Sequence, residues 1–170
     1  MLEAVEREAA AIIPRPGGMA ALAAALRTSF GIELPSLGRW VASRRLTLAR
    51  TAPHQMLALR DGAGNGLFEE LEAALGAHAG VVDLSDARAA VRLQGPRARD
   101  LLARLLPLDL HPRAMQAGHA ASTLAAHIGV LVLQLDDAPS YELLCQRSFG
   151  DSLLRALDLV RPRYDGAREA

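Results

Sequence analysis

The stretch from residue 81 to residue 112, VVDLSDARAAVRLQGPRARDLLARLLPLDLHP, constrains the fold more than any other part of the sequence. Its first apolar residues predict a short buried strand, and the alternation of apolar and polar residues over 88–94 is typical of a half-buried strand. Pro96 suits the first position of a helix, because its missing N–H would have no partner there. Leucines then recur at helical spacing, which predicts a helix over 96–105. The stretch therefore predicts a packed β-β-α unit.

Segments on both sides of this stretch predict similar elements. Apolar residues over 19–30 fall on one face of a helix, and Gly31 is placed to end it. A second helix is expected over 67–75, where leucines recur at helical spacing. Five further strands are expected over 46–50, 55–60, 122–127, 130–135 and 141–145. The third and fourth of these strands are expected to be joined near Gly129.

The two ends of the chain are expected to be helical. Residues 1–16 predict a short helix that is stopped by the prolines near its end. Ser148 and Asp151 have the spacing of a capping box at the start of the last helix. Phe149 is expected on the buried side of that helix, and Pro162 is expected to end it.

These elements fall into two similar orders, each running helix, strand, strand, helix. Two pseudo-repeated α-β-β-α halves around a mixed or antiparallel sheet make an α+β fold. We expect an N-terminal extension, a single α+β domain of two halves and a flexible tail. Their bounds are 1–16, then 17–162 with halves at about 17–80 and 81–162, then 163–170.

Composition argues against several classes of partner and location. The 19 basic and 19 acidic residues give a formal net charge of zero, so long-range attraction to nucleic acid or an anionic membrane is not expected. No run of about 18 apolar residues is present to span a bilayer, and the acidic first residues do not resemble a secretory signal. The single cysteine excludes an intrachain disulfide and suits a reducing compartment. A soluble cytoplasmic protein is therefore expected.

Histidine and cysteine residues do not predict a catalytic or metal site. His111, His119 and His127 are eight residues apart, whereas zinc ligands usually come as close histidine pairs on a helix or as cysteine pairs. Cys145 takes an alternating strand position beside leucines, and free cysteine is among the most buried residue types. We expect no metal site, and we expect Cys145 to be a core residue rather than a nucleophile.

Two short motifs are better explained as turns. Gly62, Gly64 and Gly66 lack the spacing of a dinucleotide loop, and no Walker lysine accompanies them. A loop between a hairpin and a helix is expected there. Asp136 and Asp137 precede Ala-Pro, a setting in which aspartate accepts hydrogen bonds from nearby backbone N–H groups. We therefore expect neither a cofactor site nor an acid–base pair.

Arginines cluster on the central β-β-α unit, and two interpretations of them remain open. They form a solvated outer face, or they bind an anionic ligand or an acidic partner surface. The residues concerned are Arg88 and Arg92 on the strand and Arg97, Arg99 and Arg104 on the helix.

Several motifs resemble a known family. Asp-Leu-Ser at 83–85, followed by a strand and by Gly-Pro-Arg-Ala at 95–98 opening a leucine-rich helix, resembles the folate-binding aminomethyltransferase fold of the glycine cleavage system. The run Pro-Leu-Asp-Leu-His-Pro at 107–112, with 133–139 and 146–149, resembles more narrowly the gamma subunit family of heterotetrameric sarcosine oxidase. The similarity covers about residues 80–160 well and 17–80 loosely.

The resemblance implies a non-catalytic, structural gamma subunit of a flavoenzyme that oxidatively demethylates sarcosine or a related N-methyl amino acid. It implies alpha, beta and delta partner subunits that carry FAD, FMN, NAD, tetrahydrofolate and zinc, with no cofactor in this chain. In the aminomethyltransferases a catalytic aspartate follows a Gly-rich hairpin, whereas Gly129 here is followed by the apolar run 130–133. The alternatives are a stand-alone folate-binding or one-carbon-transfer protein, and a scaffold protein of the same fold.

The long connection over 106–118 is the expected partner surface. It carries Leu108, Leu110 and Met115, which would be exposed if nothing covered them. Stable interfaces commonly have an apolar centre and a polar rim. We therefore expect these three residues to form the centre of a contact with a larger subunit, with Arg97 and Arg104 at its rim.

Overall fold

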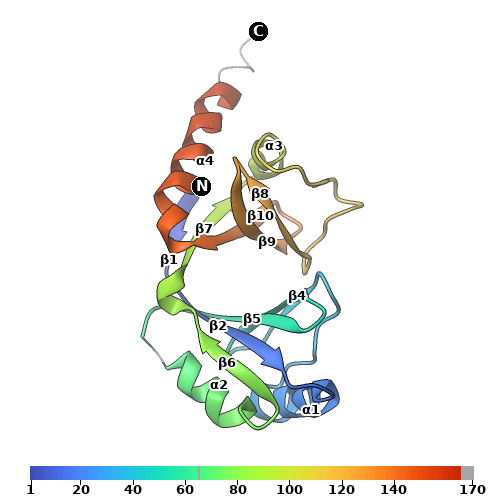
Figure 1. Ribbon diagram of the computed structural model, residues 1–170. Helices are drawn as coiled ribbons and strands as arrows, with labels where there is room; N and C mark the ends of the chain where they lie inside the picture. Colours follow the sequence, from blue (N-terminus) through green and yellow to red (C-terminus); the bar gives the residue numbers. More distant parts are fainter. Residues whose placement is uncertain (65, 166–170) are drawn as a thin grey trace. The chain divides into compact units, whose positions relative to one another are not determined.

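Each of the two units of the chain is built on a five-stranded sheet with helices packed against it (Figure 1). The computed structural model describes residues 1–64 and 66–165, and side chains as far as Val160. The first unit is Glu6–Arg88, and the second unit is Met1–Val5 together with the chain from Ala89 onward. The predicted α+β class is confirmed. The single domain over 17–162 stays a prediction. The flexible tail also stays a prediction, because its residues 166–170 lie outside the described residues.

The first unit has the strand order β3-β4-β5-β2-β6. Its strands are β2 (Arg7–Pro14), β3 (Trp40–Ala42), β4 (Thr47–Ala52), β5 (Gln55–Asp61) and β6 (Ala79–Asp83), and its helices are α1 (Met19–Phe30) and α2 (Leu67–Leu75). The glycine after α1, Gly31, has φ 64° and ends the helix as predicted. Both helices pack their leucines on Ala10 and Ile12 of β2, so this core lies on one face of the sheet.

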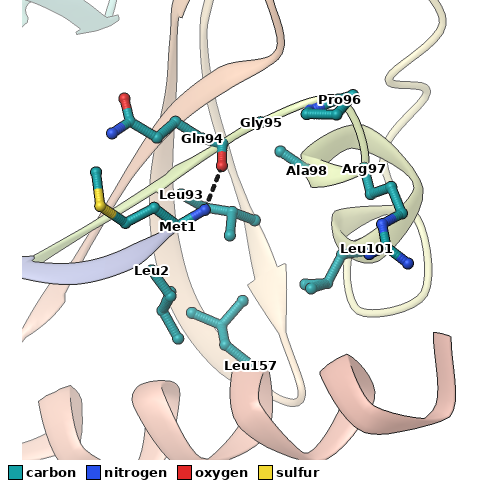
Figure 2. Close-up of a pocket in the computed structure, with 10 residues that line it drawn as sticks. All are labelled: Met1, Leu2, Leu93, Gln94, Gly95, Pro96, Arg97, Ala98, Leu101 and Leu157. Atoms are coloured by element: carbon teal, nitrogen blue, oxygen red, sulfur yellow. Dashed lines mark hydrogen bonds between the residues drawn. The ribbon is translucent and has the colours of Figure 1, made fainter. Parts of the chain in front are cut away.

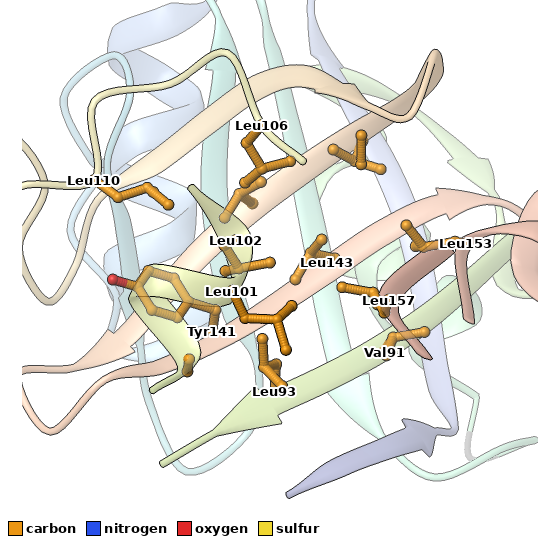
Figure 3. Close-up of a cluster of buried hydrophobic side chains, with 14 of the residues drawn as sticks. Val91, Leu93, Leu101, Leu102, Leu106, Leu110, Tyr141, Leu143, Leu153 and Leu157 are labelled. Atoms are coloured by element: carbon orange, nitrogen blue, oxygen red, sulfur yellow. The ribbon is translucent and has the colours of Figure 1, made fainter. Parts of the chain in front are cut away.

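The second unit has the strand order β1-β7-β10-β9-β8. Its elements are β1 (Leu2–Val5), β7 (Arg88–Gln94), α3 (Ala98–Leu102), β8 (Ala120–Ala125), β9 (Ile128–Asp136), β10 (Ser140–Gln146) and α4 (Gly150–Asp165), with 3-10 turns η1 (Ser85–Ala87) before β7 and η2 (Arg147–Phe149) before α4. Its core is formed by α3, α4 and one face of the sheet (Figure 3).

The two sheets have the same strand order. Read from matching ends, the orders are β3-β4-β5-β2-β6 and β8-β9-β10-β7-β1. In the chain, α1 and α3 follow the fourth strands of these orders, β2 and β7, and α2 and α4 follow the third strands, β5 and β10. The predicted pseudo-repeat is therefore confirmed. Each half has its own sheet rather than a share of a common one, and the fifth strand of the second sheet comes from the start of the chain.

The prediction of a helix over residues 1–16 is wrong. This segment forms β1 and β2 instead, with Leu2–Val5 paired to β7 and Arg7–Pro14 paired to both β5 and β6. Alanine and glutamate favour helix only by tenths of a kcal/mol per residue. Backbone pairing on both sides of β2 and burial of residues 9–12 outweigh that preference.

The predicted helix over 96–105 is shorter in the structure. It extends only over Ala98–Leu102, after which the chain turns inward and buries Leu106 and Leu110 (Figure 3). The following hairpin turns at Ala126 and His127, which have φ of 46° and 71°, rather than near Gly129. Left-handed conformations at both central residues match the twist of a two-residue hairpin.

Two further predictions about exposed positions are wrong. Val82 is 48% exposed because it lies on the face of the edge strand β6 opposite to Val81, which packs against the core, so the segment that begins the central stretch is not fully buried. Phe149 is 45% exposed, because it ends the 3-10 turn η2 before α4 begins. That turn includes Ser148, so the predicted capping box does not form. Pro162 does not end α4, since a proline removes one backbone hydrogen bond without preventing the residues after it from being helical.

A buried carboxylate joins three elements of the first unit. Glu8 on β2 is 4% exposed and accepts a hydrogen bond from Arg60 Nε on β5 at 2.9 Å. Its other oxygen accepts from the backbone N–H of Leu67, the first residue of α2, at 3.2 Å. Arg60 also donates to Glu70 at 2.7 Å, and Glu70 is paired with Arg45. The carboxylate of Glu8 therefore caps α2 and positions this helix on the sheet.

We predict that Glu8→Ala lowers the free energy of unfolding by about 3 kcal/mol, because it removes the buried acceptor that Arg60 Nε and the Leu67 N–H share. Urea denaturation of the full chain measures this loss. Glu72→Ala on the exposed side of α2 is the matched control and should change stability by less than about 0.5 kcal/mol. Equal stability of the two variants would contradict the proposed role of Glu8.

A hydrogen-bonded tyrosine lies in the core of the second unit. Tyr141 on β10 is fully buried, and its hydroxyl accepts a hydrogen bond from Arg99 Nε on α3 at 3.0 Å. Burial raises the pKa of the Tyr141 phenol above its ordinary value, and the hydrogen bond and charge of Arg99 oppose part of that rise. The folded chain therefore keeps this phenol neutral at pH values where the unfolded chain ionises.

The raised pKa of Tyr141 predicts a loss of stability in alkaline solution. The contribution of the neutral phenol is complete below about pH 10 and is lost as the pH rises through the folded-state pKa. The sequence contains no lysine to titrate in the same range. Tyr141→Phe should cost about 1 kcal/mol near neutral pH and should flatten the alkaline decline. Urea unfolding from neutral to alkaline pH tests this, and an unchanged slope in the variant would contradict it.

Candidate functional site

The residues predicted to form a partner surface divide into exposed and buried groups. Arg97 and Arg104 flank α3 and are exposed, and Leu108 is half-buried against the core. Leu110 and Met115 are each only 3% exposed, so the expectation that the loop exposes them is wrong. The loop folds back over the sheet and fills the core with these side chains. The interface itself stays a prediction. Of the residues predicted for it, Arg97, Arg104 and Leu108 are the accessible ones.

A small cavity lies beside this surface, under the turn at 95–98 (Figure 2). It has a volume of about 250 Å³, and Figure 2 shows leucines from β1, β7, α3 and α4 around it. Arg97 lies in its lining, and the ammonium of Met1 donates to Gln94 O at 2.5 Å. Ligand sites commonly measure about 300–1,000 Å³. The cavity suits a single apolar side chain or a similarly small group better than a flavin or a folate.

A second cavity of about 440 Å³ lies between α3 and the end of the 106–118 loop. Its charged lining residues are Arg99 and Asp137. Arg99 already donates to Tyr141, and Asp137 accepts from Ala117 N at 3.3 Å. Asp137 lies in the β9–β10 turn, as predicted, but its carboxylate bonds to the distant Ala117 rather than to a neighbouring N–H, so it anchors the loop to this turn.

The three histidines at spacings of eight residues lie in or beside turns. His111 Nδ1 accepts from Arg113 N at 3.2 Å, and His119 Nδ1 accepts from Gln116 N at 3.0 Å. His127 occupies the turn between β8 and β9. Among the described residues, no three of His, Cys, Asp and Glu are grouped so that they could hold a metal ion. Cys145 is fully buried in the core of the second unit, which confirms the predicted core position of its thiol.

The glycine-rich loop does not fit a phosphate or a dinucleotide. It connects β5 to α2, as predicted, and Gly66 with φ 77° precedes the helix. Phosphate loops aim free N–H groups at the start of a helix toward the anion. Here Glu8 accepts from the first of these N–H groups, and Glu69 adds negative charge in the first turn of α2. A carboxylate of the chain thus already occupies the place that a phosphate would need.

Sequence reasoning missed a buried ion pair in the second unit. Glu142 on β10 is fully buried and accepts from Arg92 Nη2 on β7 at 3.0 Å. Arg92 is therefore not simply part of a solvated face, and Arg99 is held by Tyr141. The one signal for Glu142 was a carboxylate among the otherwise apolar residues 141–145. Of the five clustered arginines, Arg97 and Arg104 remain on the accessible surface.

No helix within the described part of the chain combines the length and apolarity that crossing a bilayer requires.

Comparison with known proteins identifies relatives over most of the chain. Residues 17–159 match the family described as sarcosine oxidase, gamma subunit family. The sarcosine oxidase subunit gamma of Arthrobacter sp is 37% identical over 132 residues, which are 77% of this chain and 64% of the relative. That of Corynebacterium sp. (strain P-1) is 36% identical over 81% of this chain and 66% of its own length. The matches thus span slightly less than two thirds of these relatives.

Solved structures agree with this similarity. A chain of the heterotetrameric sarcosine oxidase from Corynebacterium sp. U-96, in complex with pyrrole 2-carboxylate, matches all of this chain and 87% of its own with a TM-score of 0.86 and 28% identity. The glycine cleavage system aminomethyltransferase T from Bartonella henselae matches with a TM-score of 0.68 at 19% identity, covering 92% of this chain and 44% of its own, and shows the shared fold alone. The chain belongs to the sarcosine oxidase gamma subunit family.

Proposed function

We propose that this chain is a non-catalytic, structural subunit of a heterotetrameric sarcosine-oxidase-like flavoenzyme. The assembly oxidatively demethylates sarcosine or a related N-methyl amino acid and releases the demethylated amine, a one-carbon unit and hydrogen peroxide. The observation that carries the proposal is the match of the whole chain to a subunit of a heterotetrameric oxidase, together with the family match over 17–159.

The hairpin of the second unit supports a non-catalytic role. The aminomethyltransferases that this chain resembles use an aspartate after a Gly-rich hairpin. Here Gly129 lies within β9 and is followed by apolar residues, and the turn itself is formed by Ala126 and His127. No carboxylate occupies the matching stretch, so the aspartate chemistry of that family has no equivalent residue in this hairpin.

We assign the cofactors to the other subunits. FAD, FMN, NAD and tetrahydrofolate belong to the alpha and beta subunits in this proposal, and zinc belongs to the delta subunit. The support from this chain is electrostatic, because Glu8 accepts from the N–H group that a phosphate-bearing cofactor would need at the start of α2. The carboxylate of Glu69 in the first turn of α2 reinforces this exclusion.

The contact with a larger subunit is proposed to centre on the surface around α3. Arg97 and Arg104 provide exposed positive charge at the two ends of that helix, and Leu108 adds a half-buried apolar side chain. Leu110 and Met115 support this surface from inside the core. Charged residues at the rim of an interface raise the association rate and the selectivity of binding.

The stand-alone alternative makes a different prediction. A folate-binding or one-carbon-transfer protein would bind tetrahydrofolate in isolation. For a structural subunit we expect no saturable heat of binding when the purified full chain is titrated with tetrahydrofolate. Saturable binding at one site per chain would favour the alternative.

We predict that the double variant Arg97→Glu, Arg104→Glu weakens capture of the larger oxidase subunits by about tenfold, which corresponds to about 1.4 kcal/mol. Charge reversal at the rim opposes the acidic partner surface that these arginines would face. The test is co-expression of the tagged full chain with the other subunits, followed by quantification of the captured protein. Arg155→Glu on the exposed side of α4 is the control and should leave capture unchanged. Equal capture by the double variant would place the interface elsewhere.

A further inference from the structure

Strand β8 is an open edge of the second sheet (Figure 1). It pairs only with β9, in a continuous antiparallel register from Ala120 opposite Leu133 to Ala125 opposite Ile128. His119 O accepts from Gln134 N at 3.0 Å, which sets the alternation of the ladder. The backbone groups of residues 119, 121, 123 and 125 therefore bond to β9, because every second residue of an antiparallel edge strand directs its N–H and C=O groups toward the neighbouring strand.

The intervening residues present their backbone groups to the outside. The N–H and C=O groups of Ala120, Ser122 and Leu124 point away from β9, and within the described residues no other strand lies on that side of β8. Ser122 is exposed, and the Leu124 side chain is 50% exposed. These residues form a straight row of donors and acceptors that fits another extended backbone.

This edge lacks the features that usually prevent strand addition. Proteins protect edges with very short strands, charged side chains or proline. Among the described sheet edges, β3 has only three residues, β1 carries Glu3 and β6 ends at Asp83. Strand β8, with the sequence AASTLA, has six residues and neither charge nor proline. It is the one long unprotected edge among them.

We propose that β8 accepts an extended segment of a larger subunit, which adds a sixth strand to this sheet. The inference rests on the proposed function, which supplies a different chain as the occupant. Main-chain hydrogen bonds provide the affinity in this mode of recognition, and alternate side chains provide the selectivity. The small side chains of Ala120 and Ser122 allow close approach, and Leu124 favours an apolar residue beside it. The expected segment is therefore uncharged on this side and free of proline.

Ser122→Pro tests the edge directly. Proline removes the outward N–H of Ser122, while the ladder to β9 uses the groups of residues 121 and 123, and proline is tolerated on an edge strand when its nitrogen faces outward. Ser122→Ala is the matched control because it removes the hydroxyl and keeps the N–H. Tagged full-length chains are co-expressed with the larger subunits. We expect Ser122→Pro to reduce capture by about tenfold or more, with Ser122→Ala equal to the wild type.

Hydrogen exchange at single amides tests, without a variant, whether β8 pairs with a strand of a larger subunit. In the isolated chain the N–H groups of Ser122 and Leu124 should exchange quickly, while that of Thr123 is already protected by β9. Assembly should slow exchange at Ser122 and Leu124 by about tenfold or more and leave Thr123 nearly unchanged. Unchanged exchange at Ser122 and Leu124 in the captured complex would overturn the proposal, even if Ser122→Pro fails to fold.

The remaining outcomes separate this proposal from the proposed function. A captured wild-type chain together with equal capture of Ser122→Pro overturns the edge contact alone. An isolated wild-type dimer that Ser122→Pro converts to a monomer assigns the edge to a second copy and also overturns the proposal. A wild-type chain that captures no larger subunit overturns both this proposal and the proposed function.

Discussion

The first unit depends on strand β2, which pairs with a neighbour on each side. Strand β6 joins the sheet through β2 alone, and β5 lies on the other side of it. Pairing on both sides satisfies the backbone N–H and C=O groups of the buried residues 10–12, while the N–H of Ala9 donates to Ser85 Oγ. Ala10 and Ile12 also form the floor on which α1 and α2 pack. Because Glu8 on the same strand caps α2, one strand determines the positions of both helices and of β6.

The two repeated units differ in the origin of their fifth strand. Both units use the same strand order, but the fifth strand of the first unit follows α2, whereas that of the second unit is β1 from the start of the chain. The first fourteen residues therefore contribute to both sheets. The charged pairs within the units, Glu8 with Arg60 and Glu142 with Arg92, join elements of the structure to one another. These carboxylates act in packing and capping, which agrees with a structural subunit.

Sequence patterns predicted the elements whose periodicity is strong and local. Helices α1 and α2, the β4–β5 hairpin and strands β7 and β10 lie within a few residues of their expected bounds. The pattern failed where distant partners decide the outcome. The alanine-rich start of the chain becomes strand because β5 and β6 bond to it, and Leu110 and Met115 are buried because their loop folds over the core. No local signal contains that information. Exposure of Arg97 and Arg104 follows from their places beside a short helix, whereas Arg92 and Arg99 bond to Glu142 and Tyr141, which lie 50 and 42 residues away in the sequence.

Native mass spectrometry of the complex captured by the tagged full chain can establish whether this chain is a subunit without a cofactor. We expect one copy of this chain in a complex with three different larger or smaller subunits, and gentle dissociation should release it without bound flavin. A complex that turns over sarcosine or a related N-methyl amino acid should contain this chain in stoichiometric amount. Recovery of the chain alone, or its release with flavin still attached, would contradict the assignment as a non-catalytic subunit.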